Sequence, residues 1–274
     1  MIKGKVYLIG AGPGDPDLIT VKAIKALQKS DVVLVDRLVS SKILEDYFSG
    51  EIIHVGKECR RGASTPQSTI NDMIVQYALE GKTVSRLKGG DVSIFSNVLD
   101  ELKVLKIHSI SYEIIPGITA ALGAASYSGI PLTAREYSTA VRFMTYYKSD
   151  LVNDEYWKDL AQTKDTLVFY MSVATLPKVI EKLKRENVLP DKKIAIIEQA
   201  TTPLQRVHTC SFEEYESTLK DKKFISPSLV IIGSVVELHD QFHWLENNSS
   251  EDQYFPPVEK LNNYLTYKYV ENAV

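Results

Sequence analysis

The hydrophobic and polar positions along this chain alternate between two patterns. Short apolar runs rich in β-branched residues, such as Val32 to Val35, are typical of strands buried on both faces of a parallel sheet. Between these runs, apolar residues recur every three positions, as in Leu18, Val21 and Ile24, which indicates helices with one buried face. This βαβα order predicts an α/β fold with a mostly parallel sheet in the first half of the chain.

The same pattern gives the bounds of the expected elements in that half. Strands are predicted at residues 6–9, 32–35, 52–55, 83–87 and 112–115. Helices are predicted at residues 17–30, 68–79, 98–105 and 119–127.

The second half of the chain predicts a mixed sheet. Expected strands are 141–146, 166–170, 193–197, 205–210 and 228–232, and the clearest helix is 176–186. The third and fourth of these strands are separated by too few residues for a crossover, so we expect them to pair antiparallel. We place one α/β domain at residues 1–134 and a second at 135–246, with the boundary near 134–138, followed by a polar tail at 247–274.

Composition narrows the possible classes of protein. The chain has 274 residues and a net charge of −3, which gives no global sign of nucleic-acid or membrane binding. The two cysteines, Cys59 and Cys210, form no CxxC motif, which argues against a disulfide framework or a zinc site. The first residues enter a strand pattern directly, and no apolar run is long enough to span a bilayer. We expect a cytoplasmic protein with no metal, no nucleic acid and no membrane.

A glycine-rich loop follows the first predicted strand. It resembles a dinucleotide-binding loop, but position 15 carries Asp15 where that motif needs a glycine, and Pro13 lacks an amide that could hold a phosphate. Two interpretations stay open. The loop is a tight strand-to-helix turn, or it is a wall against which a ligand without phosphate packs.

Two further strand ends carry candidate binding residues. Gly89, Gly90 and Asp91 follow one strand, where a carboxylate could accept hydrogen bonds from a ligand's amine or hydroxyl group. Here we expect Asp91 to matter for binding and not for the fold, although a plain turn is the alternative. Thr119 is a plausible helix N-cap, and the small residues after it favour close helix packing over cofactor space when taken alone.

Charged pairs follow the second and third strands. Asp36 precedes Arg37, and Gly56 precedes Lys57. Such groups form either an ordinary ion pair or an acid and a base in a shared cleft. Spacing alone leaves both readings open.

Several segments together resemble a known family. They are VYLIGAGPGDPDLIT, VLVDRLVS, HVGKE, QSTIND, RLKGGD, IIPGITAALGAASYSGIPLT, TLVFYM and IIGSVV, and they extend from about Lys5 to Trp244. In order and spacing they resemble uroporphyrinogen-III C-methyltransferases of the tetrapyrrole methyltransferase family. The resemblance implies a homodimer of two-domain chains that binds S-adenosylmethionine in the cleft between the domains and releases S-adenosylhomocysteine.

The resemblance also implies roles for individual residues. The cofactor contacts it implies are Pro13, Gly89, Gly90, Asp91, Ile94, Thr119, Ala120, Met171 and Ala200. It makes Asp36 the proton acceptor and Lys57 the proton donor, and it places Arg86 near the substrate. The chain departs from the family pattern at residues 92–97, at Ala134 and at Ala200. These departures bear on turnover and substrate tolerance more than on the fold.

A tetrapyrrole with many carboxylates needs cations in its binding site. Basic residues cluster at the predicted strand ends and in the loops after them, and we expect Arg37, Arg60, Arg61 and Lys88 to bind the substrate. A solvated loop is the alternative for Arg60 and Arg61.

The expected activity is conversion of uroporphyrinogen III to precorrin-2 by two methyl transfers to pyrrole carbons. The product would enter sirohaem or cobalamin-type biosynthesis. Two alternatives remain. The chain methylates a later precorrin on the same scaffold, or it binds the cofactor or a tetrapyrrole without turnover.

Overall fold

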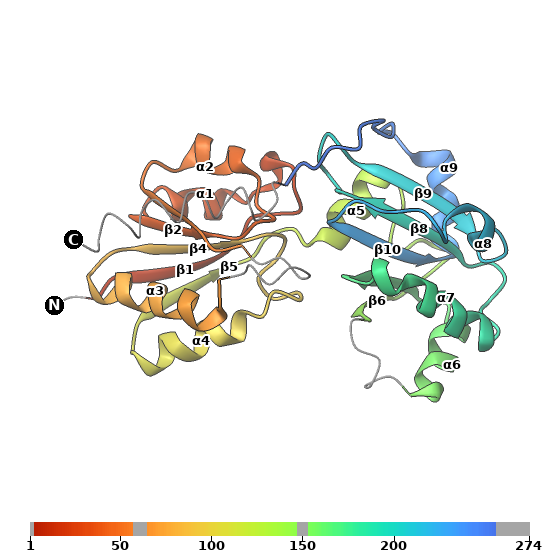
Figure 1. Ribbon diagram of the computed structural model, residues 1–274, viewed down its shortest axis with the longest axis horizontal. Coiled ribbons are helices and arrows are strands. Elements are labelled where there is room, and N and C mark those ends of the chain that lie inside the picture. Colours follow the sequence, from red (N-terminus) through yellow and green to blue (C-terminus); the bar gives the residue numbers. More distant parts are fainter. Residues whose placement is uncertain (1–2, 57–64, 147–152, 256–274) are drawn as a thin grey trace. The chain divides into compact units, whose positions relative to one another are not determined.

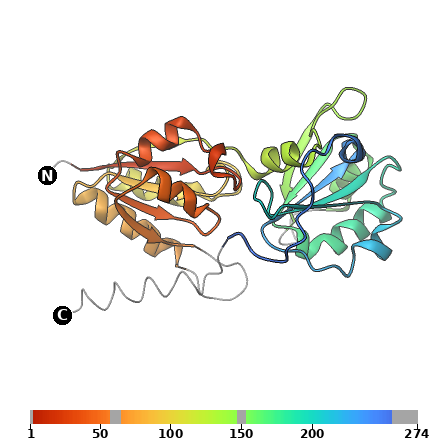
Figure 2. The ribbon, with the colours of Figure 1, turned by 90° about the horizontal axis from the view of Figure 1, so that it is seen from above.

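The computed structural model describes residues 3–56, 65–146 and 153–255. They divide into two units. The first comprises the described residues up to Thr119 together with Phe255, and the second runs from Ala120 to Tyr254. The division falls earlier than the boundary expected near 134–138, because the helix α5 (Ala120–Ser128) belongs to the second unit (Figure 2). The amide of Ala121 at its start donates to Tyr170 Oη at 3.1 Å.

The first unit contains a five-stranded sheet in which every pairing is parallel. Its strands are β1 (Lys5–Gly10), β2 (Val32–Val35), β3 (Glu51–His54), β4 (Val84–Lys88) and β5 (Ser111–Ile115), in the order β3-β2-β4-β1-β5. The neighbouring strands β1 and β4 send their connections in opposite directions, to β2 and to β5. Open parallel sheets bind ligands at the carboxyl ends of such strands.

Helices cover both faces of this sheet (Figure 1). They are α1 (Val21–Leu27) and α2 (Ser41–Tyr47) on one face, and α3 (Gln67–Leu79) and α4 (Val98–Ile107) on the other. Successive residues of β2 point to opposite faces, so both faces need apolar side chains, which explains its unbroken apolar run. The predicted helix 17–30 is shorter in the structure: a turn, η1 (Pro16–Leu18), precedes α1, whose first turn is capped by Thr20 Oγ1 accepting from the Ala23 amide.

The second unit contains a mixed sheet. Its strands are β6 (Val141–Thr145), β7 (Thr166–Tyr170), β8 (Lys193–Glu198), β9 (Arg206–Ser211) and β10 (Ser228–Gly233), in the order β6-β7-β10-β8-β9. Only β6 and β7 pair in parallel in this described sheet, and the predicted antiparallel pairing of β8 with β9 is confirmed. The two sheets together confirm the predicted α/β fold class.

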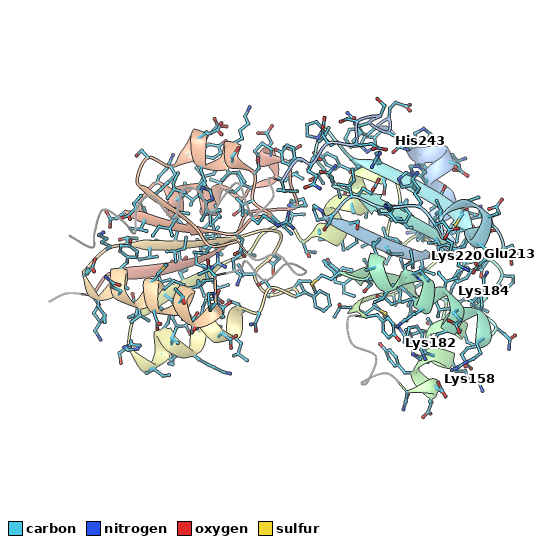
Figure 3. All side chains as sticks on the ribbon, in the orientation of Figure 1. Lys158, Lys182, Lys184, Glu213, Lys220 and His243 are labelled. Atoms are coloured by element: carbon cyan, nitrogen blue, oxygen red, sulfur yellow. The ribbon has the colours of Figure 1, made fainter. Side chains whose placement is uncertain are left out.

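Helices flank the second sheet. They are α6 (Asp154–Gln162), η3 (Val173–Thr175), α7 (Leu176–Arg185), α8 (Tyr215–Thr218), η4 (Ser234–Leu238) and α9 (His239–Phe242). The pattern of apolar residues had not predicted α6, which buries Trp157 and Leu160 in the core. Charged side chains of α6 and α7 include Lys158, Lys182 and Lys184 (Figure 3).

The predicted tail begins within the second unit. Asn247 Oδ1 accepts from the amide of Val207 on β9 at 2.6 Å, and the amide of Tyr254 donates to Gln199 Oε1 at 2.7 Å. These residues are therefore part of the unit, while 256–274 lie outside the described residues. No helix in the described part of the chain is long and apolar enough to cross a membrane.

Candidate functional site

Three glycines meet at the carboxyl ends of β1, β4 and β5. We call Gly10, Gly90 and Gly117 the glycine contact. A Cβ atom added to Gly10 would lie 2.6 Å from the Gly117 nitrogen and 2.7 Å from the Gly90 oxygen, too close for any side chain. Gly90 also has φ = +69°, which favours glycine. The three loops therefore meet backbone against backbone.

Hydrogen bonds hold the first of these loops to the second. The amide of Gly12 donates to the Gly90 oxygen at 3.1 Å, and the amide of Gly90 donates to the Gly12 oxygen at 2.7 Å. Pro13, a predicted cofactor contact, comes directly after this pair. The structure thus brings Pro13, Gly89 and Gly90 to one edge of the sheet. The loop is a tight turn, and its role as a wall for a ligand stays a prediction.

Asp91 joins the second loop to the third. Its Oδ2 accepts from the amide of Gly117 at 2.9 Å, while its Oδ1 accepts from the amide of Ser93 at 2.8 Å and from Ser93 Oγ. The side chain is only 9% exposed. All these donors are protein groups, so Asp91 has a structural function that the sequence did not reveal. Its predicted contact with a cofactor stays a prediction.

Four charged side chains form a connected group beside β4, which we call the β4 charge network: Asp36, Arg86, Lys88 and Glu101. Arg86 Nη2 lies 2.5 Å from Asp36 Oδ1, and Arg86 Nε lies 3.3 Å from Glu101 Oε1. Lys88 Nζ donates to the same Glu101 oxygen at 2.9 Å. The network contains two cations and two carboxylates, so its formal charges balance.

The members of the β4 charge network differ sharply in exposure. Arg86 and Lys88 are 2% and 3% exposed and Glu101 is fully buried, whereas the side chain of Asp36 is 28% exposed. Burial lowers the pKa of Lys88, and the adjacent Arg86 charge lowers it further, against the opposing effect of Glu101. Asp36 is therefore the member that an external molecule could reach most readily.

Sequence reasoning missed Glu101. A signal was present, since Glu101 and Leu105 are one helical turn apart on α4 and both are buried. A charged residue in an apolar stripe needs a partner, and β4 supplies two cations. The sequence alone did not show that α4 packs over the end of β4.

The other predicted residues of the first unit have varied surroundings. The amide of Ile94 donates to the backbone oxygen of Asp91 at 3.4 Å, which closes a turn. Thr119 is buried. Arg37 is half-buried, and its Nε has no hydrogen-bond partner among the described residues. Predicted residues that lie outside the described part of the chain are Lys57, Arg60 and Arg61.

Three predicted cofactor contacts belong to the second unit. Met171 directly follows β7 and Ala200 comes two residues after β8, and these strands run in the same direction because both are antiparallel to β10. Both residues therefore lie at one edge of that sheet. Ala120 begins α5, which the Tyr170 hydroxyl holds to the end of β7. The structure thus brings these three residues to one region of the unit.

Backbone conformation distinguishes this edge. Met171 has φ = +54° and is 52% exposed, while Gln199 and Thr201 on either side of Ala200 have φ of +48° and +66°. Left-handed conformations are unfavourable for residues other than glycine and are common at binding sites. An exposed methionine in such a conformation is suited to contact an apolar part of a ligand.

A cavity is also present in the second unit. It has a volume of about 220 Å³ and is lined by Met144, Thr145, Tyr146, Tyr156, Trp157, Leu160 and Phe169. None of the predicted site residues lines it. Among the described residues, no group of three histidine, cysteine, aspartate or glutamate side chains is arranged to hold a metal ion.

The fold and the loops at the strand ends define the class of this protein. Residues 5–216 match the family model of the tetrapyrrole (corrin/porphyrin) methylases. The chain belongs to this family, which confirms the resemblance seen in the sequence.

Named relatives and solved structures agree with this assignment. The chain is 44% identical to a siroheme synthase of Pseudomonas fluorescens over 249 residues, which are 90% of this chain and 53% of that protein. It therefore spans about half the length of the curated relatives it matches. A uroporphyrin-III C-methyltransferase from Thermus thermophilus, solved with S-adenosylhomocysteine, has 33% identity and a TM-score of 0.71, covering 86% of this chain and 94% of that one. A cobalt precorrin-4 methyltransferase has 27% identity and a TM-score of 0.74, covering 85% and 95%.

Proposed function

We propose that this chain transfers methyl groups from S-adenosylmethionine to two pyrrole carbons of uroporphyrinogen III, giving precorrin-2. The family and the solved Thermus thermophilus neighbour with S-adenosylhomocysteine support this reaction. The observation that carries the proposal is the partly exposed Asp36 at the carboxyl end of a parallel strand, paired with the buried Arg86. The siroheme synthase relatives favour a role in sirohaem formation.

Each unit, taken by itself, has one feature that supports a role in binding the cofactor. On the first unit, the glycine contact brings three loops together backbone against backbone at the carboxyl ends of parallel strands, the edge at which such sheets bind ligands. On the second, the exposed Met171 offers a thioether surface. The cofactor supplies an electrophilic methyl group on a sulfonium with a neutral leaving group. The protein has to hold the pyrrole carbon in line with that methyl group.

Asp36 is the proposed proton acceptor. When the C–S bond breaks and a new C–C bond forms at the pyrrole carbon, the macrocycle gains a positive charge that it loses by giving up a proton. The carboxylate of Asp36 is partly exposed, and Arg86 fixes its orientation through Oδ1. Its second oxygen is the one we assign to proton removal.

The carboxylates of the substrate need cations that are not already neutralised. Lys88 and Arg86 are buried and share Glu101, so their charges are balanced within the protein. Arg37 is half-buried and adjoins Asp36 in the chain. We assign it to a substrate carboxylate, together with the predicted contribution of Arg60 and Arg61.

An anaerobic incubation tests the proposal directly. Protein, uroporphyrinogen III and S-adenosylmethionine are mixed, and the tetrapyrrole is analysed by mass spectrometry. We expect a product that carries two added methyl groups, with one S-adenosylhomocysteine formed for each methyl group transferred. An unmodified tetrapyrrole, with the cofactor bound but unconsumed, would support a binding protein instead.

A later precorrin is the second candidate substrate. The similarity to a cobalt precorrin-4 methyltransferase is the observation that favours it. The same assay with a precorrin mixture separates the two, since methylation of a precorrin but not of uroporphyrinogen III would assign the chain to a later step.

A further inference from the structure

Glu101 is fully buried and receives several donors on one oxygen. Its Oε1 accepts from Lys88 Nζ at 2.9 Å, from Arg86 Nε at 3.3 Å and from Gln67 Nε2 at 3.4 Å. Its Oε2 has no hydrogen-bond partner among the described residues. A buried carboxylate that leaves one oxygen unsatisfied retains part of its desolvation cost. Stability alone therefore explains this residue poorly.

The guanidinium of Arg86 is held on all its sides. Nε donates to Glu101 and Nη2 donates to Asp36, while Nη1 donates to the backbone oxygens of Leu34 at 3.3 Å and Leu87 at 3.4 Å. A planar group with this many fixed partners has one orientation. Glu101 and Asp36 are its two charged partners, and they contact different nitrogens.

The exposed fraction of the side chains increases along this series of contacts. Glu101 is buried, Arg86 is 2% exposed, and Asp36 is 28% exposed. Glu101 cannot reach an external molecule, and in the described part of the chain it is linked to Asp36 through Arg86. We propose that Glu101 is a positioning residue for methyl transfer: it fixes Arg86, and Arg86 holds the proton-accepting carboxylate of Asp36. This inference rests on the proposed function.

The test compares two variants with a matched control. Glu101→Gln keeps the size of the side chain but removes its charge, and Glu101→Asp keeps the charge but withdraws it by one methylene group. We expect both to lower kcat by about 30-fold, with the KM for S-adenosylmethionine and the Kd for S-adenosylhomocysteine changed by less than about threefold. Glu198→Gln is the control, because Glu198 is also fully buried and ion-paired. It should lower the melting temperature while kcat at saturating cofactor stays within about threefold of wild type.

A double-variant cycle separates positioning from stability. If Glu101 acts through Arg86, combining Glu101→Gln with Arg86→Lys should lower kcat by no more than about threefold beyond Arg86→Lys alone. Losses that multiply would overturn the proposal, as would wild-type kcat in both Glu101 variants or failure of both to fold. Wild-type protein that methylates no tetrapyrrole would instead refute the proposed function, and this is measured before any variant.

Discussion

Glu101 and Glu198 are both fully buried and both contact two basic side chains, yet their surroundings differ. Glu101 on α4 contacts Arg86 and Lys88 near the carboxyl end of the parallel strand β4, and its network ends in the partly exposed Asp36. Glu198 ends β8, where Arg206 Nε lies 2.8 Å and His208 Nε2 lies 3.0 Å from its Oε2. Both of these partners lie on the adjacent strand β9, and the amide of Ile225 also donates to Glu198. This second network contains no partly exposed carboxylate among its described members.

A buried ion pair therefore indicates function mainly through the residue at which its network ends. A network whose members all lie on adjacent strands, like that of Glu198, holds those strands together. A network that ends in a reachable carboxylate can also set the orientation of a reacting group. The substitutions below test whether the two networks differ in this way.

The largest effect is expected for Asp36→Asn. Asparagine keeps the shape of the exposed end of the β4 charge network but cannot accept a proton as a carboxylate does. We expect kcat to fall by about 10²–10⁴-fold, the usual contribution of a positioned base, while S-adenosylhomocysteine still binds by calorimetry. The control is Asp46→Asn on the exposed face of α2, which should leave kcat unchanged. Nearly full activity in Asp36→Asn would remove its role as proton acceptor.

The next effect is expected for Glu198→Gln, on stability. Removing one charge from a buried pair should lower the free energy of unfolding by about 3 kcal/mol at neutral pH, measured by urea denaturation. Burial raises the pKa of Glu198, but hydrogen bonds from His208 and the Ile225 amide, with the Arg206 charge, bring that pKa below its ordinary value of 4.5.

The lowered pKa of Glu198 gives this prediction a pH signature. A carboxylate with a lowered pKa in the folded state stabilises the protein above its ordinary pKa, and the stabilisation is lost as pH falls through the folded value. The difference in unfolding free energy between wild type and Glu198→Gln should therefore be constant above pH 4.5 and shrink below it. A difference that grows on acidification would contradict the assignment.

A smaller effect is expected for Asp91→Ala. Asp91 is the third buried carboxylate of the described residues, and its bonded donors are the Gly117 amide and the Ser93 amide and hydroxyl. Leaving these donors unsatisfied should cost about 2 kcal/mol in the free energy of unfolding of the apo protein. The exposed change Asp72→Ala on α3 should cost less than about 0.5 kcal/mol. Unchanged apo stability with weakened S-adenosylhomocysteine binding would restore the interpretation drawn from sequence.

Much of the fold could be predicted from the sequence because its strands have strong patterns. The unbroken apolar run of β2 requires burial on both faces, and the short link between β8 and β9 permits only antiparallel pairing. The unit boundary was harder to place, because α5 is rich in small apolar residues that fit either sheet. The bond from Ala121 to Tyr170, which ties α5 to the second sheet, joins residues far apart in the chain.

The site could be predicted only where motifs follow strands directly. The glycines and Asp91 were found because parallel strands end at the same sheet edge. The burial of Lys88 and the pairing of Arg86 and Lys88 with Glu101 were not predicted, since they depend on α4 covering β4. The predicted roles of Lys57, Arg60 and Arg61 stay predictions.

The glycine contact also limits how this chain can evolve. Because Gly10 and Gly117 each occupy the space that a methyl group on the other's loop would need, gaining alanine at either position requires the backbone of a second loop to move. Such a change is not corrected by altering one neighbouring side chain, since the obstructing atoms belong to the main chain. Lineages that modify substrate choice are therefore expected to keep these positions invariant and to vary the residues that follow them.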